Sequence, residues 1–285
     1  MCNFTIISDL TSDEEELLYS EFPPNDYEYV KVADIINDNW QPFFNNRRCV
    51  GIAKSNDTIA LLEAHDIGVL GYESTTLEPL TCAYIVTDHK AIEKVDLETV
   101  DCRFHNRPLT ILETNRCIIR EHSLDDFDAI CDIYSHESMT EFMEPLFEPD
   151  EEREYQKRYI ERIYKFFGYG LWLIVNKADG KVIGRAGVET KESCKDYSQV
   201  ELSYQVAVPY QNQGIATEVC LAIVDYTFNT LGKSSIIARV DKENIPSVRL
   251  VTELGFHLLE DGVYILNATD KMLKEKKDEF EQGKQ

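Results

Sequence analysis

The sequence lacks the patterns that mark several common classes of protein. Its eight cysteines form no CxxC pair and no other spacing typical of a metal site. No apolar run approaches the roughly 18 residues that a membrane-spanning helix needs, and no charged-then-apolar leader opens the chain. These absences predict a protein of the reducing cytoplasm that binds neither a metal nor a membrane.

Basic residues are also scarce. The chain has 29 Lys and Arg against 52 Asp and Glu, which gives a formal net charge of −23. Such an excess of negative charge repels the phosphates of nucleic acids and of anionic lipids, so neither is expected as a partner. The simplest consequence of this charge is solubility.

The chain is long enough for two ordinary domains, and its pattern changes near residue 112. With 285 residues, of which 43% are hydrophobic, it can bury two cores. We therefore predict one domain over residues 1–112 and a second over residues 113–285. Both combine strands with helices, so the expected fold class is α/β, or mixed α+β.

The first domain contains a βαβ pattern with parallel strands. A strand at 49–53, a helix at 58–65 and a strand at 69–72 are followed by a third strand at 82–88. This unit resembles the closing half of a haloacid-dehalogenase-like (HAD) domain, which is small and Rossmann-like. However, the chain has no D-x-D-x-[TV] nucleophile motif, and Lys54 stands where that family has a metal-binding acid. The resemblance therefore implies a non-catalytic domain, with a role in dimerisation, in delimiting a substrate site or in packing alone.

The most informative segment of the chain is "PYQNQGIAT", residues 209–217. It lies between an alternating strand pattern at 200–208 and an amphipathic helix pattern that ends near Gly232. The free N–H groups and positive dipole at a helix N-terminus suit a phosphate, and glycine lets the backbone approach a ligand closely. The spacing is neither that of the P-loop nor that of the dinucleotide fingerprint. The predicted anion-binding residues are Gln211, Asn212, Gln213, Gly214, Ile215, Ala216 and Thr217.

This segment resembles the [QR]-x-x-G-x-[GA] pyrophosphate loop of the GNAT acetyltransferases. A second GNAT-like signature, "NIPSVRLVTELGF", lies at 244–256, and the predicted order of elements over 114–268 is that of the family. The motifs "YGLW", "VIG" and "ELSY" are similar to the branch that includes ribosomal-protein N-terminal alanine acetyltransferases. The resemblance implies a central mixed, mostly antiparallel sheet with acetyl-CoA as co-substrate. In the family, the backbone of the strand before the loop pairs with the pantetheine arm, which implies Val206, Ala207 and Val208 here.

Acetyl transfer to an amine needs a proton acceptor and stabilisation of the leaving thiolate. Glu201 lies on the polar face of the 200–208 strand and is the expected general base, acting directly or through a water. The alternative is a structural carboxylate that bonds to its neighbours. Asn244 and Ser247 stand where the family contacts coenzyme A near its sulfur, although both could simply cap a helix. The tyrosine acid of many GNAT enzymes is replaced here by Val251.

The acceptor site is expected among aromatic residues of the first helical region and the loop before "GLW". Residues of this kind are as readily explained by core packing, and the sequence leaves both readings open. The expected acceptor is a small-molecule amine or a peptide N-terminus, and a homodimer is compatible with the sequence. Transfer would be direct, in a ternary complex. The rival interpretation is a non-enzymatic acyl-CoA-binding or interaction module. The aromatic candidates are Tyr134, Phe142, Tyr169 and Trp172.

Overall fold

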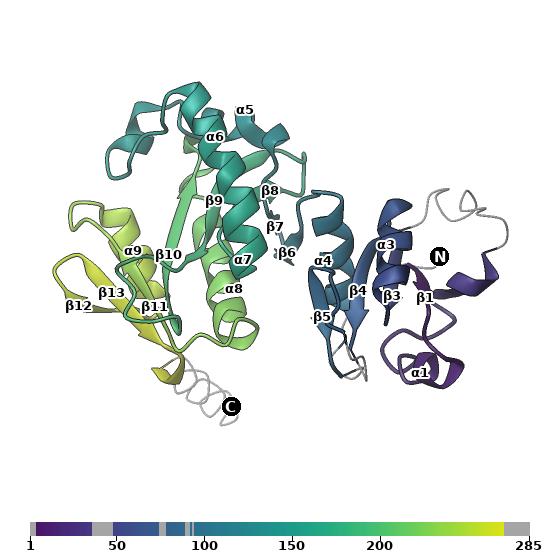
Figure 1. Cartoon of the computed structure of the whole chain (residues 1–285). Coiled ribbons are helices and arrows are strands. Elements are labelled where there is room, and N and C mark those ends of the chain that lie inside the picture. The colour runs from purple at the N-terminus through teal and green to yellow at the C-terminus, as the bar shows by residue number, and fades with distance from the viewer. Residues whose placement is uncertain (1–3, 36–47, 74–77, 89–91, 93, 271–285) are drawn as a thin grey trace. The chain divides into compact units, whose positions relative to one another are not determined.

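The computed structural model describes residues 4–35, 48–73, 78–88, 92 and 94–270. Within this part the chain divides into two compact units, residues 1–109 and residues 110–285. Both units combine strands and helices (Figure 1), and each is described by itself.

The first unit is built on a parallel sheet. Among the described residues this sheet has five strands in the order β2-β1-β3-β4-β5, and every adjacent pair runs parallel. The βαβ pattern read from the sequence corresponds to β3, α3 and β4, whereas β1 and β2 were not anticipated. The elements are β1 (Thr5–Ser8), α1 (Ser12–Glu16), β2 (Glu28–Lys31), η1 (Val32–Asp34), β3 (Cys49–Ala53), α3 (Asn56–Ala64), β4 (Gly68–Tyr72), β5 (Tyr84–Val86) and α4 (Lys94–Phe104).

The second unit is built on a mixed sheet. Its eight described strands follow the order β12-β13-β11-β10-β9-β8-β7-β6, and only β10 and β11 pair in parallel. The mixed, mostly antiparallel sheet expected from the sequence is therefore present. The strands are β6 (Thr110–Glu113), β7 (Cys117–Arg120), β8 (Leu171–Asn176), β9 (Val182–Glu189), β10 (Gln199–Val206), β11 (Ser235–Arg239), β12 (His257–Glu260) and β13 (Val263–Asn267).

The helices of the second unit connect these strands in the expected order. Between β7 and β8 come η4 (Leu124–Asp126), α5 (Phe127–Ile133), η5 (Glu137–Thr140), α6 (Pro149–Tyr159), the π-helical turn η6 (Ile160–Tyr164) and α7 (Lys165–Phe167). After β10 come η7 (Val208–Tyr210), α8 (Ile215–Asn229) and, after β11, α9 (Ile245–Glu253). The two hairpins turn at Gly180 and Gly262, both of which have positive φ, as the Asp-Gly pairs predict.

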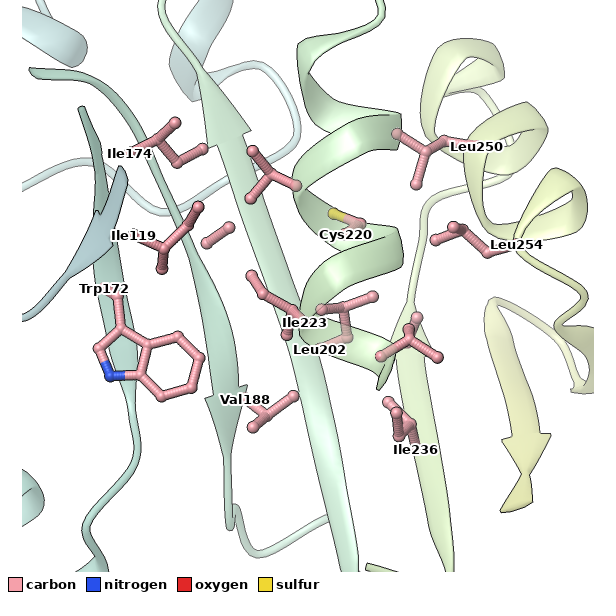
Figure 2. Packing of buried hydrophobic residues seen from close by; sticks show 14 of the residues in the cluster. Ile119, Trp172, Ile174, Val188, Leu202, Cys220, Ile223, Ile236, Leu250 and Leu254 are labelled. Atoms are coloured by element: carbon pink, nitrogen blue, oxygen red, sulfur yellow. The ribbon is translucent and has the colours of Figure 1, made fainter. Parts of the chain in front are cut away.

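The two faces of the central strands have different partners because side chains alternate along a strand. One face packs against α8 and α9: Figure 2 shows Trp172, Val188 and Leu202 of the strands together with Ile223 of α8 in one core. Full burial of such a side chain contributes about 1.5–3 kcal/mol. The other face carries Glu189, whose Oε1 accepts a hydrogen bond from the Tyr159 hydroxyl of α6 at 2.7 Å. The face toward α8 is therefore apolar, whereas the opposite face combines polar contacts such as this one with a smaller apolar cluster of Leu173, Val175 and Ile130 of α5.

Candidate active site

A cavity opens where β10 and β11 separate. The two strands pair only from Gln199–Glu201 to Ser235–Ile237, whereas β10 continues to Val206 alongside β9. Beyond Glu201 the other edge of β10 therefore borders a cavity of about 1000 Å³. This cavity is lined by both strands and by the beginnings of α8 and α9. Its volume lies at the upper end of the range of about 300–1,000 Å³ that is typical of sites for small molecules and cofactors.

The exposed edge of β10 presents backbone groups to this cavity. The Ala207 amide donates to the Ile183 carbonyl of β9 at 2.8 Å, so alternation turns the backbone of Val206 toward the cavity. The Val206 carbonyl accepts a hydrogen bond from Gln211 Nε2 at 2.9 Å. The backbone of Ala207, which was expected to pair with the pantetheine arm, already has partners within the protein. Its amide is bonded to β9, and its carbonyl accepts from the Tyr210 amide at 2.8 Å. Val208 opens η7 instead of extending the strand.

The loop before α8 ends in an open helix N-terminus. Gly214 is the N-cap with φ +74, and no side chain of the described residues caps this end. The Glu218 amide makes the first bond back to the Gly214 carbonyl, at 3.1 Å, so the preceding amides of the turn have no partner within the helix. Gly214, Ile215, Ala216 and Thr217 line the cavity together with Gln211 and Asn212. Gln213 does not, because its Nε2 donates to the Pro209 carbonyl at 2.9 Å.

Arg116 adds a positive charge beside this loop and was not found from the sequence. Its Nη1 donates to the Gln213 carbonyl at 2.8 Å and its Nε to Glu218 Oε2 at 2.6 Å. Burial raises the pKa of Glu218, but hydrogen bonds from Thr114 and Arg116 outweigh it and lower that pKa below its ordinary value. Because Arg116 precedes Glu218 by 102 positions, no local spacing could have linked the two.

We expect Gly214→Val to weaken acetyl-CoA binding well over tenfold, where each tenfold step is about 1.4 kcal/mol. A β-branched side chain is strained at φ +74 and would project from the loop where a diphosphate must come close. Calorimetric titration with acetyl-CoA measures the change. Gly232→Val is the matched control, since Gly232 also has positive φ (+62) and open space around it but does not line the cavity. Equal affinity in both folded variants would overturn the assignment of the loop.

The beginning of α9 forms the facing wall of the cavity. Asn244 caps the helix by accepting a hydrogen bond from the Ser247 amide at 3.2 Å, and both residues line the cavity. The Tyr204 hydroxyl donates to the Ser247 carbonyl at 3.4 Å. Burial raises the pKa of Tyr204, so its hydroxyl stays protonated. Val251, which stands where many GNAT enzymes have a tyrosine acid, is fully buried in the core. Tyr204 instead contributes a hydroxyl to the cavity wall, and the sequence analysis did not single it out.

Glu201 lines the cavity at the point where the two strands separate. Only 6% of it is exposed. Its Oε1 accepts from Lys191 Nζ at 2.8 Å, its Oε2 accepts from Ser193 Oγ at 2.8 Å, and Arg239 Nε lies 3.3 Å away. Although burial acts to lower it, the hydrogen bond and charge of Glu201 raise the pKa of Lys191. The sequence reading anticipated the burial of this carboxylate but not its two cationic neighbours.

Comparison with known proteins agrees with this geometry. The family model described as "Acetyltransferase (GNAT) domain" matches residues 116–257. The second unit carries a GNAT acetyltransferase domain. "Uncharacterized N-acetyltransferase p20" of Bacillus licheniformis is 26% identical over 51% of this chain and 81% of its own length. "Uncharacterized N-acetyltransferase YoaA" of Bacillus subtilis is 28% identical over 54% of this chain and 85% of its own length.

Solved structures of acetyltransferases are similar to about half of the chain. A GNAT-family acetyltransferase from Bacillus anthracis covers 55% of this chain and 97% of its own, with 17% identity and a TM-score of 0.48. An acetyltransferase from Agrobacterium tumefaciens covers 54% and 91%, with 22% identity and a TM-score of 0.46. The protein is a transferase enzyme, and its GNAT domain implies acetyl-CoA as co-substrate.

The aromatic residues expected at the acceptor site of the GNAT domain separate into two groups. Phe142 lines the cavity, and the Tyr134 hydroxyl accepts a hydrogen bond from Gln205, another lining residue, at 2.7 Å. Trp172 is instead fully buried and packs edge-on against Tyr226 of α8. Tyr169 is buried as well, and its hydroxyl is hydrogen-bonded to Thr190 and to Lys233. For these last two residues, core packing, the alternative left open by the sequence, describes their place in the structure.

The described residues contain neither a metal-binding cluster nor a membrane-spanning helix. No group of three or more His, Cys, Asp or Glu side chains is placed to hold a metal ion in the part of the chain that the structure describes. Within the same residues, no helix has the length and apolar character needed to cross a membrane.

Proposed function

We propose that this protein transfers an acetyl group from acetyl-CoA to a primary amine directly, within a ternary complex. The observation that carries the proposal is the divergence of β10 from β11 over a cavity that ends at the open N-terminus of α8. A backbone edge and a helix N-terminus, placed in line, suit a ligand with an amide-bearing arm and a diphosphate. The match of residues 116–257 to the GNAT acetyltransferase family supports the same conclusion.

Each predicted site residue has a proposed task in this reaction. When bound, acetyl-CoA supplies the acetyl group as an activated thioester. The amides of residues 214–217 hold its diphosphate, and the exposed edge of β10 at Val206 aligns the pantetheine arm. Asn244 and Ser247 are assigned to the sulfur end of the cofactor, where the Tyr204 hydroxyl would stabilise the departing thiolate by turning its proton away from the Ser247 carbonyl.

Glu201 is proposed to receive the proton that the amine loses. Both carboxylate oxygens already have partners in Lys191, Ser193 and Arg239. The proton therefore reaches Glu201 through a water molecule that connects it to the amine. Phe142, which lines the cavity, and Tyr134, which is hydrogen-bonded to the lining residue Gln205, are proposed to contact the acceptor.

The finer assignments suggested by the sequence are proposals too. The "ELSY" and "VIG" motifs support a place near the ribosomal-protein-alanine acetyltransferases. The all-parallel sheet of the first unit supports a HAD-like, non-catalytic domain separate from the second. A cytoplasmic location and a homodimeric state are also proposed.

The proposal is tested by incubating the purified chain with acetyl-CoA and a panel of amines, and by following the release of free thiol. The panel contains a peptide with N-terminal alanine, an amino-acid amide, a polyamine and an aminoglycoside. We expect turnover with at least one class, and no acetylated protein by intact mass when acetyl-CoA is added alone. Tight binding of acetyl-CoA without turnover of any amine would favour a non-enzymatic acyl-CoA-binding module, and an acetylated protein would contradict direct transfer.

A further inference from the structure

The first turn of α8 carries a negative charge beside the loop that is proposed to hold the diphosphate. Glu218 follows the N-cap Gly214 by one turn. Although burial raises its pKa, hydrogen bonds from Thr114 and Arg116 lower it, so this carboxylate is ionised. A carboxylate in the first turn of a helix is attracted by the free amides and the positive dipole of that end. An unrestrained Glu218 would therefore compete with a diphosphate for the same groups.

Arg116 holds this carboxylate by both of its oxygens. The Arg116 amide donates to Glu218 Oε1 at 2.9 Å, and the Arg116 Nε donates to Glu218 Oε2 at 2.6 Å. Neither residue lines the cavity, whereas residues 214–217 do. The two side chains are 46% and 20% exposed, so substitutions in this pair should leave the fold intact. The carboxylate is thus tied to Arg116 and kept from the cavity side of the loop.

The same guanidinium fixes the peptide group that precedes the helix. Arg116 Nη1 donates to the Gln213 carbonyl at 2.8 Å, and Arg116 Nη2 is 3.7 Å from the position that a Cβ on Gly214 would take. In a trans peptide the C=O of one residue and the N–H of the next point in opposite directions. The Gly214 amide therefore points away from Arg116 and is left for the side on which Gly214 borders the cavity.

The turn between β6 and β7 holds Arg116 in place. The Arg116 carbonyl accepts from the Lys177 amide at 2.9 Å. On either side, the Thr114 amide donates to the Cys117 carbonyl at 2.8 Å, and the Cys117 amide donates to Thr114 Oγ1 at 3.0 Å. Because these bonds involve the backbone and Thr114, replacing the Arg116 side chain changes the charge beside the loop without loosening the turn.

We propose that Arg116 is a positioning residue that makes the loop before α8 selective for acyl donors that carry a diphosphate. It neutralises Glu218 and holds it aside, so the amides of residues 214–217 stay free for the phosphate oxygens. Without Arg116, Glu218 would turn to these amides and its charge would repel the diphosphate. A donor without phosphate would bind equally well in either case. This inference rests on the proposed function and names the residue on which its choice of donor depends.

Calorimetric titration with acetyl-CoA tests this in the wild type, Arg116→Met, Glu218→Gln and the double variant. Arg116→Met should bind acetyl-CoA about tenfold or more weakly, as expected for one uncompensated like charge close to the ligand. Glu218→Gln should bind at least as tightly as the wild type, because it removes the competing charge. The double variant should regain most of the lost affinity although it lacks Arg116. A double variant as weak as Arg116→Met would overturn the proposal.

Further variants separate the local charge from net charge and from packing. Arg116→Lys keeps a positive charge beside Glu218 and should retain most of the affinity. Lys177→Met is the matched control: its ammonium lies 2.8 Å from Glu113 Oε2, and Lys177 does not line the cavity. Its affinity for acetyl-CoA should equal that of the wild type, and a loss as large as that of Arg116→Met would contradict the proposal. If Arg116→Met does not fold, Arg116→Gln takes its place, because glutamine also removes the charge but keeps a donor for the Gln213 carbonyl.

A shorter ligand shows whether the effect comes from the diphosphate. S-acetylpantetheine carries the thioester and the amide-bearing arm without phosphate, so Arg116→Met should bind it as the wild type does. Equal weakening for both ligands would mean general damage to the site and would overturn the proposal. The predicted affinities without turnover of any amine would count against the proposed function alone. Turnover of an amine, with an acetyl-CoA affinity that Arg116→Met leaves unchanged, would count against this inference alone.

Discussion

Replacing Glu201 by glutamine should lower turnover about a hundredfold to ten-thousandfold, the usual value of a positioned general base. Glutamine keeps the size of the side chain and one of its two accepting oxygens. Since the substitution leaves the loop before α8 untouched, the affinity for acetyl-CoA should not change. The remaining activity should rise with pH, because a larger fraction of the acceptor amine is then already neutral. Steady-state kinetics over a range of pH, together with calorimetric acetyl-CoA binding, measure both effects.

Glu189→Gln is a close control for this experiment. Glu189 lies directly opposite Glu201 in the register of β9 and β10. It is 3.7 Å from the same Lys191 ammonium but does not line the cavity. Both variants lose one carboxylate beside Lys191, and only Glu201→Gln removes the proposed base. Wild-type turnover in Glu201→Gln, with equal losses of stability in the two variants, would mean that Glu201 only anchors Lys191 and Arg239.

Local rules explain the parts of the site that the sequence predicted. A glycine at positive φ before α8 and an asparagine cap before α9 depend on a few neighbouring residues, so they can be recognised from spacing alone. The same holds for β10, where strict alternation separates Glu201 and Gln205 from the core-facing residues. Gln211 to Thr217, apart from Gln213, line the cavity.

Long-range packing explains what the sequence did not reveal. Arg116 reaches the loop before α8 from the turn between β6 and β7, and Arg185 is paired with Gln205 only through the register of β9 and β10. Trp172 and Phe142 are both aromatic residues near predicted turns, yet one is in the core and the other is at the cavity. Such differences depend on which face of a sheet a helix covers, and no local pattern encodes it.

Strands β8 and β9 of the second unit make one very close backbone contact. A Cβ atom placed on Gly187 of β9 would lie 1.9 Å from the Gly170 carbonyl oxygen and 2.9 Å from Leu171 Cα. The backbone at this point is held on both sides: the Leu171 amide donates to the Tyr159 hydroxyl at 2.7 Å, and the Leu171 carbonyl accepts from the Tyr164 hydroxyl at 2.6 Å. Neither neighbour can yield without losing a buried hydrogen bond.

Gly187→Ala should therefore destabilise the protein by about 3 kcal/mol or more, the upper end of the cost of overpacking. The sign is opposite to the usual gain from replacing glycine by alanine in a strand. For a unit of this size, such a loss lowers the midpoint of thermal unfolding by roughly 6–12 °C. Gly180→Ala is the control, because Gly180 has positive φ but no atom within 4 Å of an added Cβ, so only local strain of about 1 kcal/mol is expected. If calorimetry finds Gly187→Ala as stable as the wild type, the hydrogen bonds that Leu171 makes with Tyr159 and Tyr164 do not fix β8.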